Sequence, residues 1–210
     1  MQQDALYPAR LSVDYPERDL NRLTTFFRLF AAIPILIILG SVSGETWQWS
    51  TDKGTAAAAS AGGLLFFGPL LMILFRQKYP RWWFDFNLQL ARFSTRVSSY
   101  LALMSDRYPS TDEEQSVHLD VDYPNVKQDL NRWMQLVKWF LAIPHYVALV
   151  ILFIAAFFAV LFAWFAILFT GRYPRSLFDF VEGVQRWGLR VQAYALLLVT
   201  DRYPPFRLAA

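Results

Sequence analysis

Few side chains in this sequence could carry out chemistry, and their arrangement argues against catalysis. Cysteine is absent, which excludes disulfides, thiolate catalysis and cysteine-ligated metals. The two histidines, His118 and His145, occur in unrelated contexts, so no histidine metal cluster is expected. His145 follows Pro144 in an apolar run, where a hydrogen bond to a carbonyl freed by the proline is commoner than a proton relay. With no phosphate-binding glycine loop and no Gly-x-Ser-x-Gly motif, we expect no enzymatic activity, no cofactor and no catalytic residue.

The remaining candidates are charged residues in a stretch that occurs twice. The stretches at 78–109 and 171–206 share Tyr-Pro-Arg, then Phe-Asp-Phe, then two arginines four residues apart, and near their ends Asp-Arg-Tyr-Pro. A helical period places one aspartate and two arginines of each copy on a polar face, opposite an aromatic-rich face. These candidate membrane-anchor or docking residues are Asp85, Arg92 and Arg96 in the first copy and Asp179, Arg186 and Arg190 in the second.

An aromatic face opposite a basic face is typical of a helix that lies in the membrane interface. We therefore expect interfacial helices at 81–104 and 175–200, with their arginines near anionic lipid headgroups. An aspartate at the start of each helix complements the helix dipole and needs no role in a site. Two arginines on one stripe argue against a transmembrane helix, since they would sit near the middle of the bilayer.

A second shared signature precedes each apolar region: Val-Asp-Tyr-Pro, followed by Asp-Leu-Asn-Arg. Asp19 and Arg22 of the first copy match Asp129 and Arg132 of the second. An aspartate ahead of a helix is a good N-cap, and an arginine three residues later can pair with it. We expect these residues to anchor a helix, with headgroup or partner binding as the alternative. The common order of the motifs predicts a tandem duplication with repeats 1–110 and 111–210.

Two short segments alternate between apolar and polar residues, at 9–15 and 117–123. This period of two predicts strands, which would pair as a small sheet on the cytoplasmic face. An extended arm on the membrane surface is equally compatible with the pattern. An open edge of such a sheet would offer a docking site to another chain.

Composition points to a membrane protein, because 55% of the residues are hydrophobic and soluble domains contain about 45–50%. Spans are expected at about 23–42 and 56–75. The run at about 130–171 is expected to form a hairpin with a tight turn near 154–158, because one helix of that length would reach ~60 Å. Arg28 and Lys138 lie near the starts of these runs, where their side chains are expected to extend back to the interface. The net charge of +3 is too small to indicate nucleic acid.

Arginine and lysine residues flank both apolar regions on either side. The positive-inside rule then places all flanks and both termini in the cytoplasm and requires an even number of crossings in each repeat. The polar start of the chain is unlike a signal peptide. We therefore expect an all-α, multi-pass protein of the bacterial inner membrane, with only the polar segment at 41–55 outside.

Several motifs resemble a known family. Asp-Tyr-Pro, Ala-Ile-Pro-His, Thr-Gly-Arg-Tyr-Pro, Phe-Asp-Phe and Asp-Arg-Tyr-Pro-Pro-Phe, most clearly between Asp122 and Phe206, are similar to the bacterial membrane proteins of domain-of-unknown-function family 4389. The first half departs from the pattern, since Ile35 replaces the histidine and a polar loop interrupts the apolar run. The resemblance implies a membrane protein and carries no established activity, substrate or catalytic residue.

These features favour a non-enzymatic integral membrane subunit. It would scaffold or dock a partner protein complex at the cytoplasmic face, in contact with anionic lipids, and homo-oligomers are compatible with it. A small transporter or channel component is an alternative, because parallel repeats with proline-containing helices occur in transporters. A lipid-binding membrane protein is another alternative. A lipid-active enzyme is disfavoured by the missing nucleophile–base pair.

Overall fold

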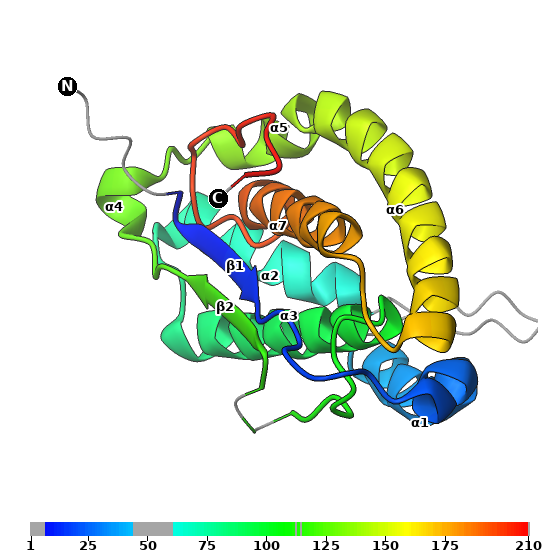
Figure 1. The fold of residues 1–210 in the computed structure, drawn as a ribbon. Helices are drawn as coiled ribbons and strands as arrows, with labels where there is room; N and C mark the ends of the chain where they lie inside the picture. The colour runs from blue at the N-terminus through cyan, green and yellow to red at the C-terminus, as the bar shows by residue number, and fades with distance from the viewer. Residues whose placement is uncertain (1–6, 44–60, 112, 114, 210) are drawn as a thin grey trace, which may run out of the picture.

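The computed structural model describes residues 7–43, 61–111, 113 and 115–209. Within these residues the chain is mostly helical, with one pair of strands (Figure 1). The elements are β1 (Ala9–Val13), α1 (Arg22–Ser43), α2 (Ala61–Arg76), α3 (Arg81–Leu101), β2 (Val117–Val121), α4 (Val126–Asp129), α5 (Met134–Leu141), α6 (Ile143–Thr170) and α7 (Arg175–Ala195).

The helices predicted in the first apolar region are present. α1 covers the expected span at 23–42 and contains Pro34 in its interior. α2 covers the described part of the span expected at 56–75. Residues 56–60 and most of the polar segment at 41–55 lie outside the described residues. By length and composition, two helical stretches are able to cross a membrane, Arg22–Val42 and Met134–Thr170.

The hairpin predicted in the second apolar region is wrong. α6 runs without interruption through 154–158, where a turn was expected, and reaches Gly171, which ends it with a φ of 78°. The sequence Ile-Ala-Ala-Phe-Phe contains no glycine, proline or polar residue that would break a helix. α6 instead accommodates its length by curving around α7 (Figure 1). Pro144 lies in the first turn of α6, where its missing N–H costs no helical hydrogen bond.

The two amphipathic helices are also shorter than predicted. α3 ends at Leu101 rather than at 104, and α7 ends at Ala195 rather than at 200. Each is followed by a leucine in the left-handed region, Leu103 with φ 65° and Leu198 with φ 56°. Both leucines are buried, so their packing sustains a conformation that side chains disfavour. The turn thus redirects the chain toward Asp-Arg-Tyr-Pro in both halves.

The predicted strand pairing is confirmed. β1 and β2 form an antiparallel pair with Leu11 opposite Leu119 and Val13 opposite Val117. Both strands alternate between buried and exposed residues, as the period of two requires. The inward side chains are apolar, while Arg10, Ser12, His118 and Asp120 point outward.

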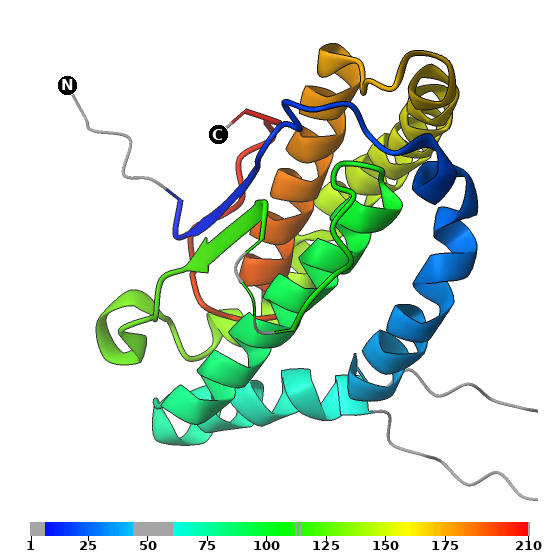
Figure 2. The same ribbon diagram turned by 60° about the horizontal axis from the view of Figure 1, so that its bottom comes forward.

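The strands rest on helices from the opposite half of the chain. β1 packs against α7, and β2 packs against α3. On the other side of these two helices, α6 packs on α7 and α1 packs on α3 and α6. Figure 2 shows the strands on one side of α3 and α7, with α1 and α6 on the other. The molecule is therefore layered as a small sheet, two amphipathic helices and an outer set of apolar helices.

The register of the sheet gives the first prediction. Cysteines at Ser12 and His118, which face each other on the exposed side, should form a disulfide under mild oxidation because opposed Cβ atoms lie about 5 Å apart. The pair Ser12→Cys and Asp122→Cys is the control, since Asp122 is about 13 Å further along the strand. Gel mobility reports the crosslink in this cysteine-free chain. Equal crosslinking of both pairs would contradict the register.

Candidate functional site: anchor clusters and a polar recess

A buried ion pair joins the start of α1 to the Asp-Arg-Tyr-Pro motif of the first half. Arg28 is only 2% exposed, and its guanidinium group pairs with Asp106. The same group donates hydrogen bonds to the carbonyl oxygens of Tyr100 (2.9 Å) and Ser105 (2.8 Å). The second oxygen of Asp106 accepts the backbone N–H of Asn21 at 2.8 Å. We call these residues the first anchor cluster.

The second half repeats this arrangement with lysine in place of arginine. Lys138 is fully buried, lies 2.8 Å from Asp201 and donates to the carbonyl oxygen of Thr200 at 2.7 Å. Asp201 also accepts the backbone N–H of Asn131 at 2.5 Å and the side-chain amide of Gln135 at 2.9 Å. We call these residues the second anchor cluster.

The anchor clusters correct the expected position of Arg28 and Lys138. Both cations lie inside the protein rather than extending to the membrane interface, because each finds a carboxylate and a backbone carbonyl there. A buried charge is costly unless it is paired and hydrogen-bonded. Each cluster therefore holds the start of an apolar helix against the Asp-Arg-Tyr-Pro segment of the same half, which follows α3 in the first half and α7 in the second.

The N-cap prediction is corrected as well. The side chain of Asn21, not Asp19, caps α1 by accepting the N–H groups of Leu23 (2.9 Å) and Thr24 (3.3 Å). In the second half, the side chain of Asn131 accepts the N–H of Trp133, the residue before α5, at 3.0 Å. Asparagine is as good a cap as aspartate.

The aspartates of the same signature have other partners. Asp19 pairs with Arg172 at 3.0 Å, rather than with Arg22. Asp129 is the last residue of the short helix α4 and accepts the backbone N–H of Asn125 at 3.2 Å. Arg22 and Arg132 are exposed, so an anchoring role for them at the membrane surface stays a prediction.

One arginine of each amphipathic helix binds the centre of a strand. Arg92 of α3 donates to the carbonyl oxygen of Leu119 at 2.9 Å and pairs with Asp120 at 3.0 Å. Arg186 of α7 donates to the carbonyl oxygen of Leu11 at 2.9 Å and pairs with Glu182 of its own helix. These bonds tie each strand to the helix of the other half.

The other two arginines hold the segments that follow the helices. Arg96 donates to the carbonyl oxygen of Ser110 at 2.9 Å. Arg190 donates to those of Arg207 (3.2 Å) and Ala209 (2.7 Å). Burial, together with the positive charges of Arg207 and Arg186, lowers the pKa of Arg190. Contact of these arginines with anionic headgroups stays a prediction that would require them to exchange their protein partners.

Asp85 and Asp179 are exposed and lie just past the first turn of α3 and α7, neither of which has an acidic residue in that turn. Asp179 forms an ion pair with Arg175 one turn away, at 3.0 Å. Asp85 occupies the matching position on α3. The helix-dipole role expected of them is therefore not supported, because that interaction is confined to the first turn of a helix.

The Tyr-Pro motifs form a further crossed contact. The hydroxyl of Tyr15 donates to the carbonyl oxygen of Tyr173, and that of Tyr123 donates to the carbonyl oxygen of Tyr79, both at 2.5 Å. The guanidinium group of Arg175 lies 4.5 Å from the ring centre of Tyr15. Burial raises the pKa of Tyr79 to about 12.

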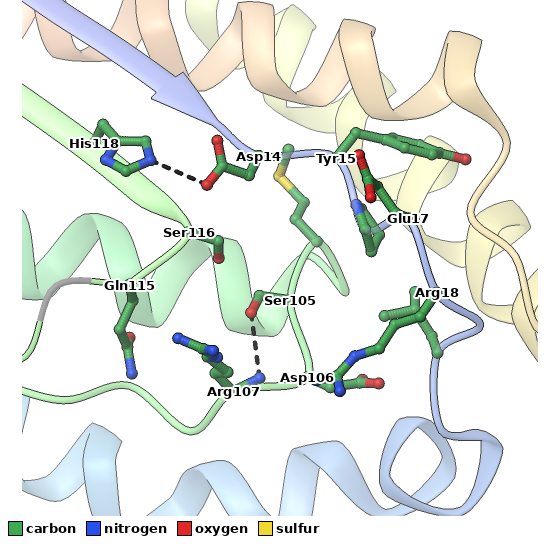
Figure 3. A pocket seen from close by; sticks show the side chains of 13 residues that line it. Asp14, Tyr15, Glu17, Arg18, Ser105, Asp106, Arg107, Gln115, Ser116 and His118 are labelled. Carbon is green, nitrogen blue, oxygen red and sulfur yellow. Dashed lines mark hydrogen bonds and ion pairs between the residues drawn. The ribbon is translucent and has the colours of Figure 1, made fainter.

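A polar recess of about 630 Å³ lies beside the first anchor cluster. Figure 3 shows Arg18 and Asp106 at one end of it and Asp14 and His118 at the other. Asp14 and His118 lie 3.0 Å apart. The recess is lined by acidic and basic side chains, which suits contact with a surface or group that also carries both signs of charge. These side chains are Asp14, Glu17, Arg18, Asp106, Arg107 and His118.

Two serines, Ser105 and Ser116, line the same recess as the Asp14–His118 pair. Ser105 accepts the N–H of Arg107 at 3.2 Å, as Figure 3 shows. A search of the described residues for three or more metal-binding side chains in one place found none.

His145 has a partner other than the expected carbonyl. Its Nδ1 accepts the indole N–H of Trp187 at 3.1 Å, and the ring of Phe206 stacks on it with centres 3.9 Å apart. His145 is buried and joins α6 to α7 and to the C-terminal segment. This environment gives it a packing role.

Sequence reasoning missed Asp106, Asp201 and Gln135 as partners of the buried cations. The one sequence signal for these contacts was the order of the motifs, because Asp-Leu-Asn-Arg precedes Asp-Arg-Tyr-Pro in both halves. Their contact depends on the path of the chain between them, which local periodicity does not report.

Comparison with known proteins reached only part of the chain. Residues 132–207 match the family model described as a domain of unknown function (DUF4389). This match supports the family resemblance for the region from α5 to the C-terminal segment, which contains Lys138, Arg186, Arg190 and Asp201. Searches of the curated proteins and of the solved structures found no match.

The second anchor cluster gives a prediction on stability. Asp201→Asn should lower the free energy of unfolding by about 3–5 kcal/mol, because it leaves the buried Lys138 without its counter-charge. Arg172→Gln is the control, since it removes an ion pair whose side chains are 78% and 64% exposed and should cost less than about 1 kcal/mol. Denaturant titration in detergent, followed by tryptophan fluorescence, measures both. Similar losses in the two variants would contradict a stabilising role for the cluster.

Proposed function

We propose that this protein is a non-enzymatic platform embedded in the cytoplasmic side of a membrane, which docks a partner protein on its sheet and polar recess. The observation that carries the proposal is a large exposed apolar surface on α1, α2, α5 and α6. Soluble monomers rarely expose apolar patches above a few hundred Å². Among its members, Phe169 is 78% exposed and Phe75 73%, and the surface continues through Leu29, Phe30, Ile37, Leu71, Trp139, Phe140, Ile151, Phe157 and Phe162.

The charged face of the sheet defines the orientation that we propose. Arg10 pairs with Asp122 on the exposed side, and Asp120 and His118 project beside them. Such groups need water, so the sheet belongs outside the hydrocarbon. Because β1 and β2 rest on α7 and α3, these two helices would lie in the interface. The apolar helices on their other side would then reach into the bilayer (Figure 2).

The curved α6 fits this orientation without crossing the membrane. Its 28 residues measure about 42 Å along the helix, while the 21 residues of α7 measure about 31 Å. The region before α5 is tied to Asp201 beyond the end of α7. The other end of α6 is tied to Leu20, whose N–H donates to the carbonyl oxygen of Gly171 at 2.8 Å. Both ends would stay on the cytoplasmic side, as the flanking positive charges favour.

A tandem duplication is the simplest origin of this architecture, and matching contacts in the two halves support it. Leu11 pairs with Leu119, its counterpart in the shared strand motif. The anchor clusters and the arginine–strand contacts recur at corresponding positions. In this reading the units 1–110 and 111–210 are related by a pseudo-two-fold axis through the centre of the sheet, along the membrane normal.

The partner would bind the outer face of the sheet rather than its edges. Arg186 and Arg92 already occupy the central carbonyl groups of the two strands, and Glu182 accepts the N–H of Val13 at 3.2 Å. These contacts leave little of either edge for the strand addition expected from sequence. The aspartates of the outward face are already paired with basic side chains, so a partner that carries both signs of charge would complement it.

The side of the membrane reached by each end of α6 is directly testable. Cysteines at Arg132 and Arg172, both exposed, should resist a membrane-impermeant thiol reagent added to intact cells and react after permeabilisation. A transmembrane α6 would place one of the two outside. External labelling of either cysteine alone would therefore reject the in-plane arrangement.

Docking is tested by photo-crosslinking from two positions of the full chain. A photoreactive residue at Ser12, on the outer face of the sheet, should crosslink to protein. The matched control at Ala155, on the exposed side of α6, should crosslink to lipid. Mass spectrometry after purification in mild detergent identifies both products. Lipid as the only product at Ser12 would contradict docking and leave membrane embedding supported.

A further inference from the structure

An apolar groove of about 630 Å³ separates α3 from α6, with α7 as its floor. α6 contributes aromatic and aliphatic side chains that include Phe153 and Phe157, and α7 contributes Gly188. α3 contributes Ser94, Thr95 and Ser98. The volume is typical of a site for a small ligand.

No charged residue lines this groove, although charged residues make up 18% of the chain. The hydroxyl groups of the α3 wall already donate to carbonyl groups of their own helix: Ser94 to Leu90 at 2.8 Å and Thr95 to Ala91 at 2.8 Å. Their oxygen atoms can still accept a hydrogen bond. The chemistry therefore favours an uncharged occupant that is mainly hydrocarbon.

The mouth of the groove is continuous with the surface that we assign to the bilayer. Phe157 is 65% exposed and Phe153 is 51% exposed, and both also line the groove. Leu196 borders it at the end of α7 and is 49% exposed. A molecule in the surrounding lipid could enter from the side without crossing a polar layer.

We propose that this groove binds one acyl chain of a membrane lipid. The inference rests on the proposed membrane embedding and adds a defined lipid site to it. Burial of the chain between α3 and α6 fills a gap that the two helices leave between them. The bound lipid thereby becomes part of the packing between the two halves of the protein.

Gly188 offers a way to close the site. A Cβ atom built there would meet only the ring edge of Phe153, at 3.6 Å, which is ordinary contact. Gly188→Ala should therefore fold and keep the groove open, whereas Gly188→Phe projects a ring into it. Ser98→Phe closes the groove from the opposite wall at an exposed position, so it provides a second blocking variant that does not depend on the floor.

The test uses phosphatidylcholine with a diazirine in the middle of one acyl chain, in proteoliposomes of the full chain. Mass spectrometry should map crosslinks both to groove residues such as Ser98 and Gly188 and to the outward face of α6. Gly188→Phe and Ser98→Phe should each reduce groove crosslinks at least about five-fold and leave the outward face unchanged. Ala155→Phe, an equally large substitution on the outward face, should preserve the groove crosslinks.

The outcomes separate the two proposals. Crosslinks on the outward face with none in the groove would overturn the acyl-chain site and support membrane embedding. Groove crosslinks that persist in both blocking variants would also overturn the site. Absence of crosslinks from both places would overturn the embedding together with the site. The disulfide between cysteines at 12 and 118 confirms folding in each variant.

Discussion

The hydrogen bonds from Arg92 to Leu119 and from Arg186 to Leu11 hold together the two halves of this chain. Each fixes the centre of one strand on a helix from the opposite half, so neither half contains both a strand and the helix that buries it. A buried carbonyl that loses its donor is destabilising, and the apolar side of β1 and of β2 packs on α7 and on α3. The region that matches DUF4389 lacks β1, and would by itself leave the β1-contacting face of α7 uncovered.

The strands were predictable because their signal is local. Alternation at 9–15 and 117–123 predicted the face that each strand buries, although the strands end two residues earlier, at Val13 and Val121. The occurrence of one motif twice suggested that they pair. The amphipathic period likewise located α3 and α7. The path of α6 was not predictable in this way, because hydrophobic length alone cannot separate a hairpin from a long curved helix. The curvature depends on packing against α7, which lies later in the sequence.

The roles of the charged residues were the hardest to predict. A basic stripe opposite an aromatic face fits a helix on lipid and a helix on protein equally well, because both environments supply oxygen acceptors. The distinction depends on distant segments: Leu11 lies 175 residues from Arg186. Arg28 and Lys138 show the same limit, since the carboxylates that neutralise them are 78 and 63 residues away. The order of the motifs was compatible with these pairings, but the contacts themselves depend on the three-dimensional path of the chain.

This use of the arginines changes what can hold the protein at a membrane. Arg92, Arg96, Arg186 and Arg190 are bonded to protein carbonyls, so they contribute less to headgroup attraction than free side chains would. Attachment would then rest on burial of the apolar surface of α1, α2, α5 and α6, which salt does not screen. The same internal bonds keep the charged sheet on α3 and α7. In the proposed arrangement, one set of contacts therefore determines both the depth of the protein in the bilayer and the face that it presents to a partner.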